Sequence, residues 1–298
     1  MSPSSSSGAG TTPTGAETKA PVHAGVIGSP IAHSLSPTLH RAAYAALGLT
    51  GWQYHREEVR SGELTAYLAA RPPDWVGLSV TMPGKEEALA AADAVSDVAG
   101  LTGAANTLVR TDAGWAGDNT DVLGIRRAFT AAGVLPGQAS RGLVFGSGAT
   151  ARSALVALRG LGVSDVQLVV RDQARPATLE LARPLGLRVR VVRLDDPLRP
   201  GSADLAVSTV PALDPDSAGP VPPAWRGAQG CAATLDVVYR PWPTPFAREV
   251  AASGTRVIGG LEMLVHQAAA QVELMTGCVA PVTAMRASLK GLSAEPVP

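Results

Sequence analysis

The sequence predicts an α/β protein with two domains. From Val22 onward, short apolar runs alternate with stretches rich in alanine and leucine, which is the pattern of parallel βαβ units. The chain has 298 residues, which exceeds the usual size of a single hydrophobic core. Hydrophobic residues make up 46% of the chain, as expected for a folded protein.

The expected strands are short apolar runs bounded by polar or glycine-containing segments. They are Ala24–Ile27, Trp75–Val80, Leu143–Phe145, Val166–Val170, Leu205–Ser208 and Thr234–Val238. A turn at residues 112–114 separates residues 106–110 from the run that begins at Trp115, which predicts a hairpin. Prolines between Val210 and Gly230 predict a surface loop.

Two helices matter for the domain organisation. Val122–Ala132 is predicted to be a helix that Gly133 ends, and we expect a domain boundary near residue 122. The last strong helix begins near Gly260. Its apolar residues recur at helical spacing on one face: Leu261, Leu264, Val265, Ala268, Ala269 and Val272.

Charge and cysteine usage exclude several classes of partner. Lysine plus arginine equals aspartate plus glutamate at 25 each, which argues against binding to nucleic acid or an anionic membrane. Cys231 and Cys278 match neither a metal site nor a disulfide framework. No run approaches the roughly 20 apolar residues of a membrane helix. We expect a cytoplasmic protein with a small-molecule substrate and a disordered, non-secretory tail over residues 1–21.

Lys85 lies where the predicted strand Trp75–Val80 gives way to a helix, after the chain breakers Pro83 and Gly84. Most lysines are exposed on a surface, but the carboxyl ends of strands in open α/β sheets are where ligands bind. Asp121 is its candidate partner, although the run that ends at Asp121 also suits an ordinary turn. A carboxylate would favour the charged amine, whereas burial would lower its pKa, and the sequence leaves both influences open.

A glycine motif predicts a dinucleotide site. The run from Gly146 to Ala151 matches the G-x-G-x-x-A pattern, follows a predicted strand and opens an alanine-rich helix. Gly146 would permit the tight turn, and Gly148 would let the backbone approach a pyrophosphate. The helix N-terminus would offer unpaired N–H groups to the same anion. The motif therefore indicates a Rossmann-like domain.

The residues after Val170 bear on which dinucleotide is bound. Arg171, together with Arg175, would pair with the 2′-phosphate of NADP, whereas Asp172 would accept from the free 2′-hydroxyl of NAD. Because Val170 leaves the usual acidic position apolar, we expect NADP and keep NAD as the alternative.

Two serines precede the first predicted helix. Ser36 before Pro37 has the pattern of a helix N-cap followed by proline at the first helical position. Ser34 and Ser36 together also suit a bound carboxylate, which would gain two hydroxyl donors and the positive end of the helix dipole. Both interpretations stay open at this point. Asn106 and Thr107 add further polar groups.

Taken in order, these motifs resemble the shikimate dehydrogenase family, over a match from about Gly25 to Gln271. The residues that carry the resemblance are Ser34-Leu35-Ser36, Thr81 with Lys85, residues 103–107, residues 118–121, the glycine motif, Tyr239 and the helix 260–271. It implies an N-terminal α/β substrate domain (22–122, completed by 261–292) and a Rossmann-like NADP-binding domain (123–260), with the C-terminal helices returning to the substrate domain. It also implies reversible NADPH-dependent reduction of 3-dehydroshikimate to shikimate in aromatic amino acid (chorismate) biosynthesis, without a metal, by a monomer or homodimer.

The resemblance also assigns roles. Lys85 and Asp121 would form the catalytic pair, with Lys85 passing a proton to the substrate oxygen. Ser34, Ser36 and Tyr239 would hold the substrate carboxylate, and Thr81, Asn106, Asp121 and Gln267 would meet the ring hydroxyls. Gly146, Ser147, Gly148, Ala149 and Thr150 would hold the pyrophosphate, Arg171 and Arg175 the 2′-phosphate, and Thr209, Val237, Gly260 and Met263 would lie near the nicotinamide.

Five positions depart from the family pattern. Ser79 stands where many relatives have asparagine, Gly84 replaces an aromatic residue, Val122 replaces a glycine, and Val170 with Asp172 changes the residues beside Arg171. Ser79 bears on a substrate contact. Val170 and Asp172 bear on the cofactor, so an NAD-dependent quinate or quinate/shikimate dehydrogenase is an alternative. A ligand-binding regulator without catalysis is a third interpretation, against which the intact Lys85 and Asp121 argue.

Overall fold

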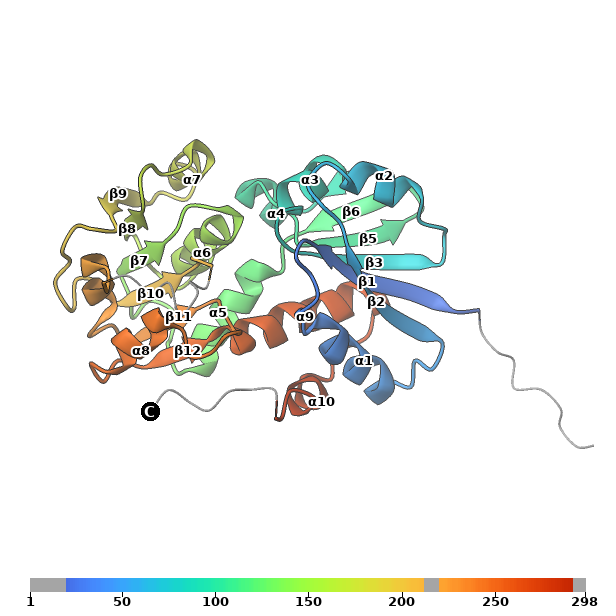
Figure 1. Cartoon of the computed structure of the whole chain (residues 1–298). Coiled ribbons are helices and arrows are strands. Elements are labelled where there is room, and N and C mark those ends of the chain that lie inside the picture. Colours follow the sequence, from blue (N-terminus) through green and yellow to red (C-terminus); the bar gives the residue numbers. More distant parts are fainter. Residues whose placement is uncertain (1–19, 212–219, 292–298) are drawn as a thin grey trace, which may run out of the picture.

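The computed structural model describes residues 20–211 and 220–291, which form two six-stranded sheets with helices packed on both (Figure 1). Helices α5 (Asp121–Ala131) and α9 (Gly260–Thr276) pack against each other and lie between the two sheets. The predicted α/β class with two halves is confirmed. Residues 1–19 of the predicted tail lie outside the described residues. The predicted domain ranges, 22–122 completed by 261–292 for the substrate domain and 123–260 for the cofactor domain, stay a prediction.

The first sheet has the order β2-β1-β3-β5-β6-β4. Its strands are β1 (Val22–Gly28), β2 (Trp52–Glu58), β3 (Trp75–Val80), β4 (Ala94–Val95), β5 (Thr107–Thr111) and β6 (Gly114–Asp118). β1, β2 and β3 are parallel, whereas β5 runs antiparallel to β3 and β6. The antiparallel pair β5 and β6 confirms the predicted hairpin. Only two residues connect these strands, which is enough for a hairpin but too short for a parallel crossover.

Helices cover both faces of this sheet. One face packs on α2 (Leu64–Ala69), α3 (Lys85–Ala90) and α4 (Asp97–Thr102) through Leu78, Val80 and Leu108. The other face meets α1 (Ser36–Ala46) and α9, and α10 (Val282–Ala287) packs on both helices. The C-terminal helices therefore return to the first half of the chain, as predicted.

The second sheet is parallel throughout, in the order β12-β11-β10-β7-β8-β9. Its strands are β7 (Arg141–Phe145), β8 (Asp165–Val170), β9 (Arg188–Arg193), β10 (Leu205–Ser208), β11 (Ala233–Asp236) and β12 (Val257–Gly259). Helices α6 (Ala149–Gly160), α7 (Pro176–Ala182) and α8 (Pro245–Ala251) flank it. Val144 packs on one face, and Leu143 and Phe145 on the other, which explains why these strands read as unbroken apolar runs.

Two local predictions are wrong. Pro223–Ala228 forms a 3₁₀ helix, η2, and its Trp225 is buried edge-on against Phe246 at 5.4 Å between ring centroids, so this part of the predicted surface loop is core. Residues 212–219 of that loop lie outside the described part. Ser36 is not the N-cap of α1, because Leu35 is already helical (φ −91°, ψ −1°) and places Ser36 in the first turn. Its hydroxyl is thereby left for other partners.

Within residues 20–211 and 220–291, no helix is both long and apolar enough to cross a membrane.

Gly260, the first residue of α9, sets how closely that helix approaches the second sheet. A Cβ built there would lie 2.2 Å from the carbonyl oxygen of Val237, which is backbone and cannot rotate away. Only glycine fits this contact.

We expect Gly260→Ala to lower the free energy of unfolding by about 1–3 kcal/mol, the usual cost of overpacking. Urea unfolding of the full chain measures this. Gly100→Ala in α4 is the matched control, because its added Cβ would meet only a side-chain carbon of Val95 at 3.7 Å. A Gly260→Ala protein as stable as the control would contradict the packing argument.

Candidate active site

The Nζ atom of Lys85 lies 2.5 Å from Oδ2 of Asp121, so the structure brings the two residues together. Lys85 is the first residue of α3 and Asp121 the first of α5. Only 14% of the lysine side chain and 6% of the aspartate side chain are exposed. Removing either partner would leave the other charge buried and uncompensated, so the pair is held together strongly.

Asn106 fixes the other side of the carboxylate. Its Nδ2 donates to Oδ1 of Asp121 at 2.8 Å and to Oε1 of Gln267 at 3.3 Å. Its Oδ1 accepts from the backbone N–H of Thr120 at 2.8 Å. Because a backbone N–H can only donate, the amide orientation is determined and its NH₂ group must face Asp121. Both oxygens of the carboxylate are therefore held.

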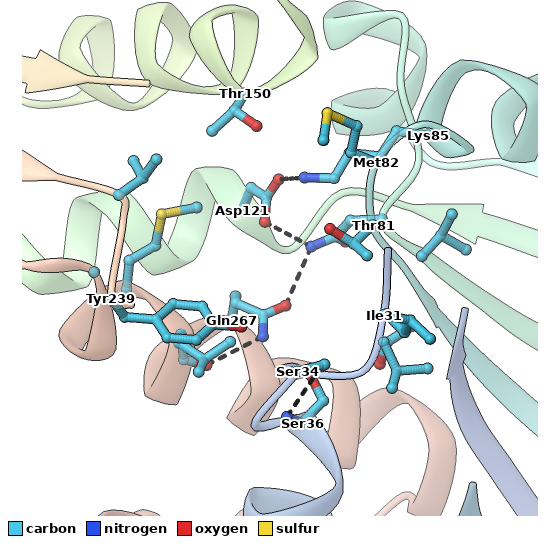
Figure 2. Close-up of a pocket in the computed structure, with 18 of the residues that line it drawn as sticks. Ile31, Ser34, Ser36, Thr81, Met82, Lys85, Asp121, Thr150, Tyr239 and Gln267 are labelled. Carbon is cyan, nitrogen blue, oxygen red and sulfur yellow. Dashed lines mark hydrogen bonds and ion pairs between the residues drawn. The ribbon is translucent and has the colours of Figure 1, made fainter. Parts of the chain in front are cut away.

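A cavity of about 260 Å³ opens beside this pair, at the carboxyl ends of β1 and β3 (Figure 2). It is lined by all the residues for which a substrate role was predicted: Ser34, Ser36, Thr81, Asn106, Asp121, Tyr239 and Gln267. Val237, Gly260 and Met263, predicted near the nicotinamide, line the same cavity. Six segments that are separated in the sequence thus contribute to one site.

Ser34, Ser36 and Tyr239 gather at one end of the cavity (Figure 2). Arg56 donates to the main-chain oxygen of Ser34 at 2.6 Å and places a positive charge near this end. Burial raises the pKa of the Tyr239 hydroxyl, so it stays protonated and able to donate. These hydroxyls beside a cation suit a carboxylate ligand.

The sequence prediction did not single out Gln271, which also lines the cavity. It donates to Thr107 Oγ1 at 3.0 Å and accepts from Ser79 Oγ at 2.7 Å, and the Ser79 oxygen is 2.6 Å from the hydroxyl of Tyr54. Ser79 is thus tied into a buried network. The signal for Gln271 was its spacing of four residues from Gln267 on an otherwise apolar helix face.

A second cavity of about 710 Å³ lies at the N-terminus of α6. The predicted cofactor residues that line it are Gly146, Ser147, Gly148, Ala149, Thr150, Arg171, Arg175 and Thr209. Thr81, Met82, Lys85 and Thr150 line both cavities. The two cavities therefore adjoin, and Lys85 lies where they meet.

The second cavity fits a dinucleotide. Gly148 precedes α6, and a Cβ built on it would meet no atom within 4 Å, so the backbone there faces open space. The Ser147 carbonyl accepts from Thr178 at 2.6 Å, and its hydroxyl accepts from the N–H of Arg175 at 3.2 Å, which holds the loop in shape. Arg171 lines the same cavity, so together with Arg175 it provides two positively charged side chains there.

Among the described residues, no three His, Cys, Asp or Glu side chains are grouped so that they could hold a metal ion.

Comparison with known families agrees with this geometry. Residues 26–108 match the model of the shikimate dehydrogenase substrate binding domain, and residues 260–290 match that of the shikimate 5'-dehydrogenase C-terminal domain. The chain is 37% identical to the shikimate dehydrogenase (NADP(+)) of Halobacterium salinarum, over 89% of this chain and 97% of that protein. It also aligns with the pentafunctional AROM polypeptide of Candida tropicalis at 37% identity, but spans only 17% of that protein's length.

Solved structures are similar as well. The crystal structure of Mycobacterium tuberculosis shikimate dehydrogenase superposes with a TM-score of 0.78 at 44% identity, covering 91% of this chain and 100% of that one. The Thermus thermophilus shikimate 5-dehydrogenase, solved in complex with NADP(H) and shikimate, gives a TM-score of 0.78 at 34% identity, covering 91% and 99%. With a matching fold, both family models and relatives aligned over nearly their full length, this chain belongs to the shikimate dehydrogenase family.

Proposed function

We propose that this protein catalyses the reversible NADPH-dependent reduction of 3-dehydroshikimate to shikimate, a step of aromatic amino acid biosynthesis. The observation that carries the proposal is the position of Lys85. Its ammonium group is paired with Asp121 at the junction of a hydroxyl-lined cavity and a dinucleotide-sized cavity. That is where a proton donor has to lie if a carbonyl is reduced between the two.

In this proposal the substrate occupies the first cavity. Ser34, Ser36 and Tyr239 hold its carboxylate, for which the protonated tyrosine and the nearby cation Arg56 provide suitable chemistry. Thr81, Asn106, Asp121 and Gln267 meet the ring hydroxyls from the side of the catalytic pair.

The residues of the chain then act on the proton. NADPH, when bound, supplies the hydride to the carbonyl carbon. Lys85 donates a proton to the oxygen as the carbonyl becomes an alcohol, and in the reverse direction it takes that proton back. Asp121 keeps the ammonium group in place, and Asn106 keeps Asp121 in place. Holding these groups in a fixed geometry is the main contribution of the protein.

NADP is the cofactor that the second cavity favours. The residues 146–150 would hold the pyrophosphate at the start of α6, and Arg171 with Arg175 would hold the 2′-phosphate. Asp172, which argued for NAD, has 78% of its side chain exposed and lies 3.6 Å from Arg193. Water and this arginine reduce its repulsion of a phosphate.

We place the enzyme in the cytoplasm, because its two cysteines are unpaired thiols and a reducing compartment preserves them. Every residue with an assigned role comes from one chain, so either a monomer or a homodimer would satisfy the proposal.

One assay tests the proposed function. The purified full chain is given shikimate or quinate with NADP⁺ or NAD⁺, and we expect the highest kcat/KM with shikimate and NADP⁺. Faster turnover of quinate with NAD⁺ would instead identify a quinate dehydrogenase. Tight binding of shikimate and cofactor without turnover from about pH 6 to 10 would identify a non-catalytic regulator.

Replacing Lys85 with alanine should remove the proton donor. We expect kcat to fall by about 10² to 10⁴, the range for losing a general acid–base group, while KM for shikimate stays within a few fold. Steady-state kinetics with both substrates measure this. A loss of only about tenfold would refute the role given to Lys85.

Replacing Arg171 with alanine should weaken NADPH far more than NADH. Loss of a hydrogen bond to a charged group costs about 1.5–3 kcal/mol, which corresponds to roughly 10- to 100-fold in affinity for NADPH. NADH, which lacks the 2′-phosphate, is the internal control. Equal effects on the two nucleotides, measured by titration of protein fluorescence, would dismiss the assignment.

Gly148→Ala should behave differently from Arg171→Ala. The added methyl group would enter the open space in which the pyrophosphate is expected, so we expect NADPH and NADH to weaken alike, by about tenfold or more. The melting temperature without cofactor should stay the same, because no protein atom is displaced. Unchanged nucleotide affinity would place the pyrophosphate elsewhere.

A further inference from the structure

Arg152 is a buried arginine on α6, the helix whose N-terminus faces the cofactor cavity, and only 2% of it is exposed. Its side chain makes its hydrogen bonds to the other half of the molecule. Nε donates to the carbonyl oxygen of Thr102 at 2.5 Å, and Nη2 donates to that of Gly103 at 3.1 Å. Nη2 also pairs with Oε1 of Glu86 at 2.6 Å. Thr102 ends α4, which lies beside α6 (Figure 1).

The groups that Arg152 holds flank the catalytic lysine. Glu86 directly follows Lys85 at the start of α3. The main-chain oxygen of Lys85 accepts from the N–H of Ala105 at 2.9 Å, two residues beyond Gly103. The guanidinium group is therefore bonded both to the neighbour of Lys85 and to the segment on which the Lys85 backbone is anchored.

Ser153, the next residue of α6, is linked in the same way to Asp121. Asn119 Nδ2 donates to Ser153 Oγ at 3.0 Å and to Thr102 Oγ1 at 2.8 Å. Oδ1 of Asn119 accepts from the backbone N–H of Asp121 at 3.2 Å. Two consecutive residues of α6 are thus linked to the ion pair. Arg152 is linked to Lys85 through Glu86 and the 102–105 segment, and Ser153 is linked to Asp121 through Asn119.

Stability alone is a poor explanation for such an arginine. Burying a guanidinium group costs solvation energy, and an apolar side chain of similar volume often stabilises a protein as well or better. Nη1 of Arg152 has no hydrogen-bond partner within the described part of the chain, which adds to that cost. The contacts of the other two nitrogens are the ones that point to a function.

We propose that Arg152, assisted by Ser153, is a positioning residue that sets the Lys85–Asp121 pair relative to the cofactor helix. The inference rests on the proposed function, in which the proton from Lys85 and the hydride meet at one carbonyl. Because a misplacement of about 1 Å can cost roughly 10²-fold in rate, a rigid link between α6 and the ion pair has a direct effect on turnover. The link acts on kcat, since Arg152 lines neither cavity.

Arg152→Met in the full chain tests this. We expect kcat to fall about 10- to 100-fold, with KM for shikimate and for NADP⁺ within about threefold of wild type. Arg152→Lys should recover part of the loss, and Ser153→Ala should lower kcat by a smaller factor of about two to five. Arg188→Met is the matched control, because it removes an exposed arginine paired with Asp165 in the same half, and its kcat should not change.

A second measurement does not depend on turnover. The chain has three lysines, Lys19, Lys85 and Lys290, so acetylation of each is resolved by peptide mass spectrometry. In Arg152→Met, we expect Lys85 to be displaced and to lose the protection that its ion pair with Asp121 and its burial provide. The rate of Lys85 acetylation, divided by that of the exposed Lys290, should then rise at least about threefold. Glu86→Ala, at a half-exposed position where we expect folding to be unaffected, should lower kcat and speed Lys85 acetylation, as Arg152→Met does.

Wild-type kcat together with unchanged Lys85 acetylation in Arg152→Met and Glu86→Ala would overturn the positioning role. So would a loss of kcat that parallels only the loss of folded protein by circular dichroism. If the wild-type protein turns over neither shikimate nor quinate, the proposed function fails, and the acetylation ratios still decide the positioning of Lys85.

Discussion

The ion pair between Lys85 and Asp121 is the interaction on which the site depends. Two charges so little exposed need their hydrogen-bonding capacity satisfied, and the structure supplies this on the acidic side through Asn106. Asn106 is in turn oriented by the N–H of Thr120. The polar groups around the pair form one network, so each has a defined orientation before any ligand is present. Such preorganisation lowers the cost of reaching a reactive geometry.

The fold explains why the pair lies between the two cavities. Lys85 begins the helix that follows a strand of the first sheet, and Asp121 begins α5, which runs between the sheets. α9 packs beside α5 and brings Gln267 to the same network from a distant part of the sequence. The contact of Gly260 with Val237 sets how close α9 can come. The two helices between the sheets thus bring Asp121 and Gln267 to this network.

The order of the motifs in the sequence predicted much of the fold and of the site. The glycine motif lies at the N-terminus of α6 as predicted, because a tight turn after a buried strand has few alternatives. Other local expectations failed where tertiary contacts outweighed local preference. Trp225 is drawn into the core against Phe246, so a proline-rich stretch contains a buried helical turn. Ser36 does not cap α1, because Leu35 has a helical conformation and Ser36 lies in the first turn of the helix.

The sequence by itself determined the α/β class, the glycine turn and the identity of the polar residues, because these depend on local periodicity and on short-range backbone chemistry. The tertiary structure decided which of those residues meet. That Lys85 contacts Asp121, that Ser79 is bound to Gln271, and that Arg152 reaches across to Glu86 follow from packing between segments far apart in the chain. A single sequence carries the residue types for such contacts but not their distances, since these arise only when helices and sheets bury their apolar faces together.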